Sequence, residues 1–152
     1  MINPPARDCI AHARTMHCLR RSAAWAVHLF RMMPTVIENL TRGTIIADHA
    51  AVARSFLARG RGLMGRAALP PGHGLIIVPE SSIHMFFMRF PIDVLFVDRQ
   101  DRVIGMREAL PPWHPFAGVA PWRGRYVVEL PAGAIRASGT ALGDQLRITP
   151  EI

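Results

Sequence analysis

Asp93 is the residue whose surroundings most clearly suggest chemistry. It is the one polar residue in the segment 92–97, which otherwise consists of large apolar residues. Such a segment is typical of a central strand covered on both faces, so we expect the carboxylate to be at least half buried. A buried carboxylate needs a partner, for which Arg61, Arg66 and Arg89 are the candidates. Asp93 then either ties the strand to neighbouring amides or acts as an acid or ligand-binding group in a pocket.

His84 is the second candidate, because Ser82 lies just before it and Asp93 follows in the next apolar segment. In an extended segment, His84 would share one face with Phe86 and Met88. A histidine on such a face is either a hydrogen-bonded core residue or a member of a catalytic or binding cluster. A Ser–His–Asp hydrolase is not predicted, since the Gly-x-Ser-x-Gly turn is missing and Ser82 and His84 are badly placed on one strand to bond each other.

Two further patterns concern metals and nucleotides. Soft ligands that suit Cu(I) occur at His84, Met85, Met88 and Met106, although methionine more often fills gaps in a core. The segment 60–65 has the form G-x-G-x-x-G, but a dinucleotide site needs a strand before this motif, where we expect a helix. We therefore predict neither a metal nor a cofactor.

The Pro-rich loop 111–124 carries two of the three tryptophans, Trp113 and Trp122. Loops of this length in compact domains are often functional. Its aromatic side chains could stack on a sugar ring, an extended peptide or a partner protein, or they could cover the open end of the sheet. We expect any ligand to lie between this loop, Arg89 and the segment 81–84.

The elements that position these residues are predicted to be short strands separated by turns. Strands are expected at 35–39, 44–47, 74–79, 83–97 with a break at Pro91, 103–109, 126–130 and 145–148, with hairpin turns at 42–43 and 99–102. Two helices are expected, over 51–66 with Ser55 as a cap and over 132–138 closed by Gly139. This pattern predicts a mainly β fold, an antiparallel sandwich or partly closed barrel of about seven short strands with two small helices.

Composition limits the class of protein. The chain has 152 residues, of which 50% are hydrophobic and 19% charged, which excludes a disordered chain and suits one domain. Only two cysteines are present, so it is not a disulfide scaffold, and none follows Cys18, which excludes thiol catalysis by the folded part. No apolar run is long enough to span a membrane.

The net charge of +7 comes from eighteen arginines and no lysine. Residues 1–33 account for +4 of it and residues 34–152 for only +3. The arginines at 54, 59, 61 and 66 form a small cluster without the interleaved aromatic residues on which single-stranded nucleic acids stack. A nucleic-acid partner is therefore unlikely on these grounds, and a solvated helix face with arginines that pair buried acids is favoured.

Residues 1–33 are predicted to form a poorly ordered or helical leader. Met32 and Met33 precede Pro34 and would make a natural start, so the leader need not belong to the native product; an intact mass near 16.8 kDa would reject that later start. A secretory signal and a zinc site are weaker alternatives, because the apolar run is short and interrupted, and adjacent histidine and cysteine suit tetrahedral ligation poorly. The zinc ligands would be Cys9, His12, His17 and Cys18. Residues 34–152 are predicted to form a single β domain.

Three blocks of the sequence carry a resemblance to a known family. They read RGLM at 61–64, FPIDVLFVD at 90–98, and VELPAG at 128–133 followed by LGDQL at 142–146. In this order, from about Asn39 to Ile148, they resemble the uncharacterised bacterial domain-of-unknown-function family 192. The resemblance implies a compact, mostly β domain and a candidate site but no reaction. Many members carry Trp-Met-Lys-Asn-Thr before the second block, whereas residues 84–88 here read His-Met-Phe-Phe-Met.

The favoured hypothesis is a small soluble β domain that acts as an accessory module and binds an unknown small molecule or protein. Its cleft is predicted near Asp93, with Ser82, His84, Arg89 and Trp113 as the other candidate residues. The alternative is an enzyme of unknown reaction with Asp93 and His84 as acid and base, which needs the two side chains within about 3–4 Å or in one ligand site. The expected compartment is the cytoplasm, since no convincing signal peptide is present.

Overall fold

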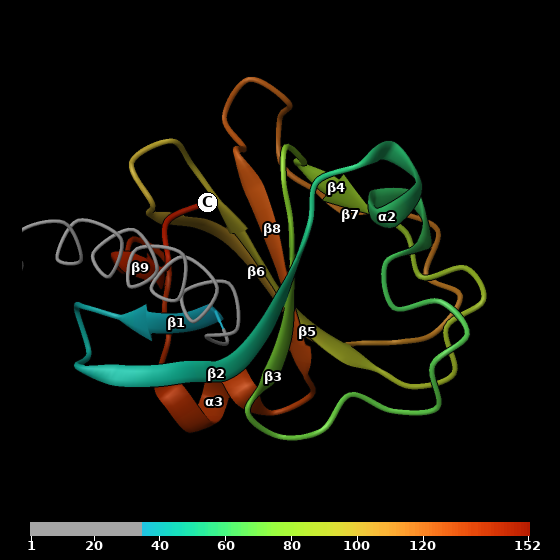
Figure 1. The fold of residues 1–152 in the computed structure, drawn as a ribbon, viewed down its shortest axis with the longest axis horizontal. Helices are drawn as coiled ribbons and strands as arrows, with labels where there is room; N and C mark the ends of the chain where they lie inside the picture. The colour runs from blue at the N-terminus through green and yellow to red at the C-terminus, as the bar shows by residue number, and fades with distance from the viewer. Residues whose placement is uncertain (1–34) are drawn as a thin grey trace, which may run out of the picture. The chain divides into compact units, whose positions relative to one another are not determined.

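The structure, a computed structural model, describes residues 35–152 and consists mainly of β-strands. In chain order the elements are β1 (Thr35–Asn39), β2 (Thr44–Ala53), α2 (Phe56–Arg61), β3 (His73–Ile77), β4 (Ser82–Ile83), β5 (Ile92–Val97), β6 (Val103–Leu110), β7 (Ala117–Gly118), β8 (Tyr126–Pro131), α3 (Ala134–Ser138) and β9 (Leu146–Thr149). Seven strands form one sheet in the order β6-β5-β8-β3-β2-β1-β9, and β4 and β7 form a second, small sheet (Figure 1).

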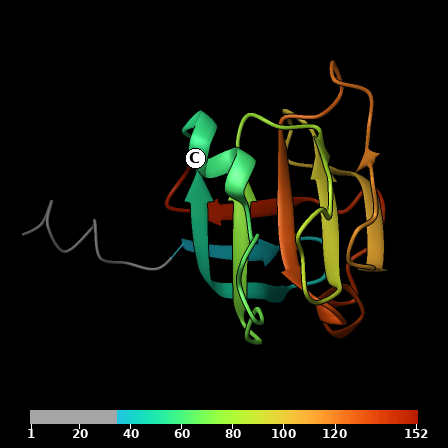
Figure 2. The same ribbon diagram turned by 90° about the vertical axis from the view of Figure 1, so that its right-hand side faces the viewer.

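The large sheet curls until its two edges approach each other. Arg102, just before β6, bridges Gln145, just before β9. The N–H of Leu146 also donates to the carbonyl of Asp101 at 2.8 Å. Figure 2 shows β1 and β9 running across the direction of β3, β5 and β8, and the long β2 bends between the two directions. This half-barrel with two short helices confirms the predicted fold class.

The region predicted as one helix over 51–66 is divided between a strand and a shorter helix. β2 continues past residue 51 because it pairs in parallel with β3, and a parallel pair needs a crossover such as the one that holds α2. Ser55 caps α2 as predicted, since its Oγ accepts a backbone N–H at 3.3 Å. α2 buries none of its residues, and Phe56 and Leu57 are 81% and 82% exposed, although the apolar residues around them suggested a packed face. Leu63, which follows the helix, is buried.

The extended segment predicted over 83–97 also differs from the structure. Residues 84–91 leave the sheet, and the N–H of Met88 donates to the carbonyl of Met85 at 3.3 Å, as in a turn. Both methionines are buried. The predicted alternation of faces around His84 is therefore wrong, because a turn brings residues three apart to one side, whereas a strand would place them on opposite sides.

The central strands carry one core layer on each face. One layer contains Leu95 and Leu130 and packs with Ile135 of α3. The other contains Val94 and packs with Leu63, after α2. We call these the α3 side and the α2 side of the sheet. Because successive side chains of a strand point to opposite faces, the two sides are reached by alternate residues of β5 and β8.

Several local predictions are confirmed, among them the strand over 35–39, the hairpin between β5 and β6, the fully buried β5 and the helix closed by Gly139. None of the helices within 35–152 is long and apolar enough to cross a bilayer. The predictions for residues 1–33 lie outside the described residues.

Candidate ligand-binding site

Asp93 is completely buried, and backbone amides occupy both of its carboxylate oxygens. Oδ1 accepts a hydrogen bond from the N–H of Ala109 at 2.8 Å. Oδ2 accepts from the N–H groups of Gly133 and Ile135, at 3.0 and 2.9 Å. Asp93 thus ties β5 to the end of β6 and to the first turn of α3.

The arginine partner predicted for Asp93 is not found. Asp93 takes part in none of the ion pairs formed among residues 35–152. Arg61 and Arg66 belong to the α2 side of the sheet, whereas Asp93 points to the α3 side, since it pairs with Leu130. Arg89 is exposed. The contacts of Asp93 match the structural interpretation of this residue.

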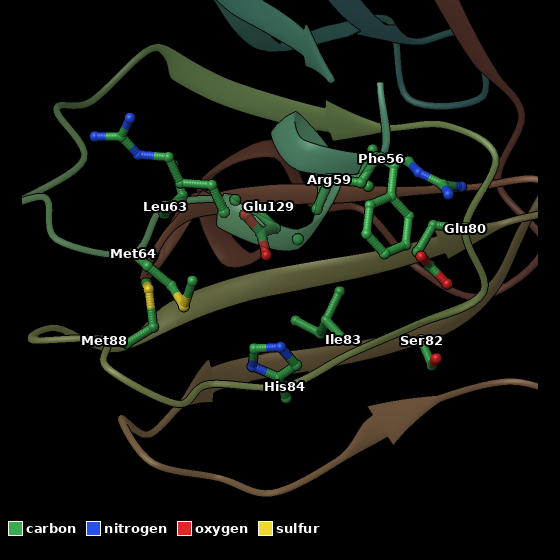
Figure 3. Close-up of a pocket in the computed structure, with 14 residues that line it drawn as sticks. Phe56, Arg59, Leu63, Met64, Glu80, Ser82, Ile83, His84, Met88 and Glu129 are labelled. Carbon is green, nitrogen blue, oxygen red and sulfur yellow. The ribbon is translucent and has the colours of Figure 1, made fainter. Parts of the chain in front are cut away.

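A pocket of about 160 Å³ lies on the opposite, α2 side of the sheet. Its walls come from α2 and the loop after it, from the end of β3, from β8 and from the segment around β4. The polar side chains that line it are Arg59, Arg61, Glu80, Ser82, His84 and Glu129. Figure 3 shows Glu129 and His84 facing the space from opposite sides, with Met64 and Met88 at one end.

Glu129 is the buried acid of this pocket. It pairs with Val94 in β5 and with Leu75 in β3, so its side chain points to the α2 side. It is 5% exposed, and no donor among residues 35–152 lies within hydrogen-bond distance of Oε2. Burial raises the pKa of Glu129 to about 7, although the guanidinium of Arg66 acts in the opposite direction.

The loop after α2 closes over this carboxylate at Gly62. A Cβ added there would stand 3.7 Å from Oε2 of Glu129, in van der Waals contact. Gly62 has a φ of 47°, in the left-handed region that side-chain-bearing residues adopt at a cost. The helix α2 precedes the glycines, so the G-x-G-x-x-G segment lacks the strand that a dinucleotide site needs, as predicted.

Arg59 places a second unsatisfied polar atom at the pocket. Its Nη1 donates to the carbonyl of Pro79, while its Nε is buried and has no acceptor among the described residues. Arg59 Nε needs an acceptor and Glu129 Oε2 needs a donor. The pocket lining therefore contains complementary unsatisfied groups.

A row of aromatic rings starts at His84 on the pocket wall. The ring centroids of His84 and Phe86 are 5.2 Å apart, those of Phe86 and Trp113 6.5 Å, and those of Trp113 and Phe87 5.2 Å. We call these four residues the aromatic strip. Phe87 and Trp113 are 64% and 58% exposed, so the outer end of the strip faces solvent.

The structure brings together only some of the residues predicted for the cleft. Ser82 and His84 line the pocket, and Trp113 is linked to it through the aromatic strip. Asp93 and His84 do not share a site, because Asp93 points to the other side of the sheet. Of the residues weighed as possible Cu(I) ligands, Met85 and Met88 lie in the core layer of the α2 side, while Met106 packs against the layer of the α3 side.

Most of the described sequence matches a known protein family. The profile of the DUF192 family, described as "Uncharacterized ACR", matches residues 37–148. The chain belongs to the DUF192 family. The resemblance predicted from the three blocks is thereby confirmed.

Relatives of this DUF192 chain include archaeal UPF0127 proteins rather than only bacterial ones. That of Thermococcus sibiricus is 33% identical over 119 residues, which cover 73% of each chain. That of Thermococcus gammatolerans is 36% identical over 115 residues, or 72% of each chain, and that of Pyrococcus furiosus is 34% identical over 114 residues, or 71% of this chain and 93% of the relative.

Two bacterial crystal structures share the fold. A protein of unknown function from Novosphingobium aromaticivorans has a TM-score of 0.65 and 23% identity, and the match covers 75% of this chain and 83% of that one. A putative transcription regulator from Sinorhizobium meliloti has a TM-score of 0.64 and 24% identity, with 75% and 91% covered. At this identity the likeness shows the DUF192 fold alone.

The blocks that carry the resemblance meet at the pocket. Gly62 of the first block lies over Glu129 of the third, and Val94 of the second block pairs with Glu129. Glu129 was not among the residues predicted for the cleft. It could have been found by the signal that drew attention to Asp93, since it is the one charged residue in the apolar segment 126–130.

Proposed function

We propose that this protein is a small-molecule-binding domain whose ligand occupies the pocket at Glu129. The observation that carries the proposal is the buried carboxylate of Glu129, which lines the pocket and whose Oε2 has no hydrogen-bond donor among the described residues. An unsatisfied buried polar group costs about 1–3 kcal/mol, and more when it is charged. A ligand that donates a hydrogen bond to this carboxylate recovers that free energy, so the pocket is organised to bind one.

The proposed function is binding, as predicted from the sequence, but the carboxylate that anchors the ligand is Glu129 instead of Asp93. Ser82 and His84 remain lining residues, and Trp113 extends the site along the aromatic strip. Asp93 contributes indirectly, because it fastens β5, the strand that pairs with β8 beside Glu129. Arg89 has no assigned contact with the ligand.

A thermal-shift screen of sugars, amines, carboxylates and phosphorylated metabolites tests this proposal on the full chain. Glu129→Leu removes the carboxylate and keeps a similar volume, and an apolar residue at a buried site leaves the fold intact. Glu38→Gln is the control, because Glu38 lies in β1 and does not line the pocket. We expect at least one compound to stabilise the wild type and Glu38→Gln but not Glu129→Leu. The proposal is refuted if no compound stabilises the wild type. It is also refuted if every compound that stabilises the wild type stabilises Glu129→Leu equally.

Catalysis is a second candidate, favoured by one observation. A pKa of about 7 suits a group that accepts and releases protons at neutral pH, and His84 faces Glu129 across the pocket. This replaces the predicted pair of Asp93 and His84. The bound compound from the screen would be incubated with wild type and Glu129→Gln and followed by proton NMR. Conversion by the wild type alone would establish an enzyme, and an unchanged compound would leave binding as the function.

A further inference from the structure

We infer that the ligand is a saccharide, with one pyranose ring in the pocket and its neighbour on the aromatic strip. This inference rests on the proposed binding at Glu129 and assigns the chemical class of the ligand. Three features of the site carry it: the complementary unsatisfied groups, the balance of charge, and the exposed aromatic rings beside the pocket.

A hydroxyl group has the chemistry that both unsatisfied side chains lack. Oε2 of Glu129 has no donor and Nε of Arg59 has no acceptor among the described residues, and both side chains line the same pocket. A hydroxyl donates one hydrogen bond and accepts up to two, so a sugar offers both a donor for the Glu129 carboxylate and an acceptor for the Arg59 guanidinium. An ammonium group has no acceptor to offer Arg59, and a carboxylate that has lost its proton has no donor to offer the ionised form of Glu129.

The charge of the lining also favours a neutral ligand. Two carboxylates, Glu80 and Glu129, are opposed by two guanidinium groups, Arg59 and Arg61. The two pairs offset each other, so the lining offers no net attraction to a strongly anionic or a cationic ligand. A polar but uncharged molecule needs no such attraction and gives up less hydration on binding than an ion does.

The aromatic strip supplies a surface for the second sugar ring. Phe87 and Trp113 have φ values of 62° and 66°, so both hold their exposed rings in a left-handed backbone conformation that is strained for residues other than glycine. Their rings meet edge to face at an interplanar angle of 62°. The C–H face of a pyranose stacks on such rings, whose faces carry partial negative charge.

The size of the pocket sets how much of the saccharide enters. The pocket measures about 160 Å³. An apolar cavity of about 150 Å³ in another protein holds one benzene ring. The pocket therefore takes no more than one six-membered ring, whose hydroxyl groups extend through its open side, and any further ring lies outside, over the strip. A terminal sugar residue of an oligosaccharide fits this arrangement.

Saturation-transfer NMR on the full chain tests the class of ligand. The probes are maltose, cellobiose, lactose and N,N′-diacetylchitobiose, with inorganic phosphate, citrate and cadaverine as charged competitors. We expect at least one disaccharide to bind the wild type. Its affinity should fall about tenfold or more in Glu129→Leu, through loss of a hydrogen bond to a charged group. In Trp113→Asn it should fall about three- to tenfold, through loss of stacking.

Matched variants separate these effects from unfolding. Asparagine adopts left-handed φ values readily, so Trp113→Asn keeps the loop conformation. Trp122→Asn is the control, because Trp122 is as exposed as any aromatic residue of the described chain but belongs neither to the pocket nor to the strip. Binding by Trp122→Asn should equal that of the wild type.

The results of this experiment distinguish a failure of the saccharide class from a failure of the proposed binding at Glu129. Binding of phosphate, citrate or cadaverine that depends on Glu129, with no disaccharide bound, would overturn the saccharide class and leave the proposed function intact. Disaccharide binding that is unchanged in both Glu129→Leu and Trp113→Asn would overturn the inference as well. If no probe binds in a way that depends on Glu129, both the inference and the proposed function fail.

Discussion

Replacement of Glu129 by glutamine should raise the stability of the protein at neutral pH and remove one source of its pH dependence. Burial raises the pKa of Glu129 from 4.5 to about 7. The unfolded chain therefore releases this proton near its ordinary pKa, whereas the folded protein keeps it until about pH 7. Between the two values the folded state binds more protons, so its free energy of unfolding falls as the pH rises. Glutamine has no proton to lose and lacks this fall.

The magnitude follows from the two pKa values. The difference of about 2.5 pKa units corresponds to about 3.4 kcal/mol, of which about 3 kcal/mol is reached at pH 7. The stability of Glu129→Gln relative to wild type should therefore increase by about 3 kcal/mol between pH 4 and pH 8. For a domain of this size, that change corresponds to a difference in melting temperature of roughly 10 °C.

Urea unfolding followed by circular dichroism, at a series of pH values from 4 to 8, measures this difference. Glu38→Gln is the matched control, since Arg147 donates a hydrogen bond to Glu38 at 2.7 Å and so lowers the pKa of that exposed carboxyl. The contact between Glu38 and Arg147 stabilises the wild type above the ordinary pKa of this carboxyl, and the contribution is lost as the pH falls. Glu38→Gln lacks the contribution, so its stability relative to wild type should decrease as the pH rises. Parallel curves for wild type and Glu129→Gln would refute the argument that Glu129 is buried without a partner.

Four further substitutions probe the framework of the fold. Asp93→Asn should lower the free energy of unfolding by about 2–3 kcal/mol, because an amide nitrogen cannot accept a hydrogen bond and one of the three buried N–H groups loses its acceptor. A loss below about 0.5 kcal/mol, measured by urea unfolding, would contradict the assigned contacts. Burial alone would raise the pKa of Asp144, but hydrogen bonds from Arg42 and Asn39 lower it overall. Asp144→Asn should thus be less stable than wild type at pH 7 and lose less stability on acidification below pH 4, in melts followed by circular dichroism. Gly72→Ala should cost about 1 kcal/mol, because Gly72 has a φ of 77° and the new Cβ would stand 2.6 Å from Oδ1 of Asp48. Gly60→Ala, in α2 with no atom within 4 Å of the added Cβ, should instead raise the melting temperature, so equal effects of the two alanines would argue against backbone strain at Gly72.

Local patterns in the sequence were sufficient for much of the fold. The strand over 35–39, the hairpin before β6 and the cap at Ser55 depend on residues that are close together in the chain. The errors arose where a distant partner overrides the local preference. Residues 51–53 look helical but pair with β3, and residues 84–91 look extended but fold back over the sheet.

The choice between the two buried acids shows what the sequence alone determines and what it does not. That Asp93 and Glu129 each lie in an apolar strand, and are therefore buried, can be read from the residues beside them. Which acid meets a pocket depends on the register of β5 against β8, where Asp93 stands opposite Leu130 and Glu129 opposite Val94. This offset of one residue directs the two carboxylates to opposite faces, because side chains alternate along a strand. On one face α3 supplies amides to Asp93, and on the other the loop at Gly62 covers Glu129 and leaves its Oε2 without a partner among the described residues. The tertiary structure alone therefore decides which of the two acids lines the pocket.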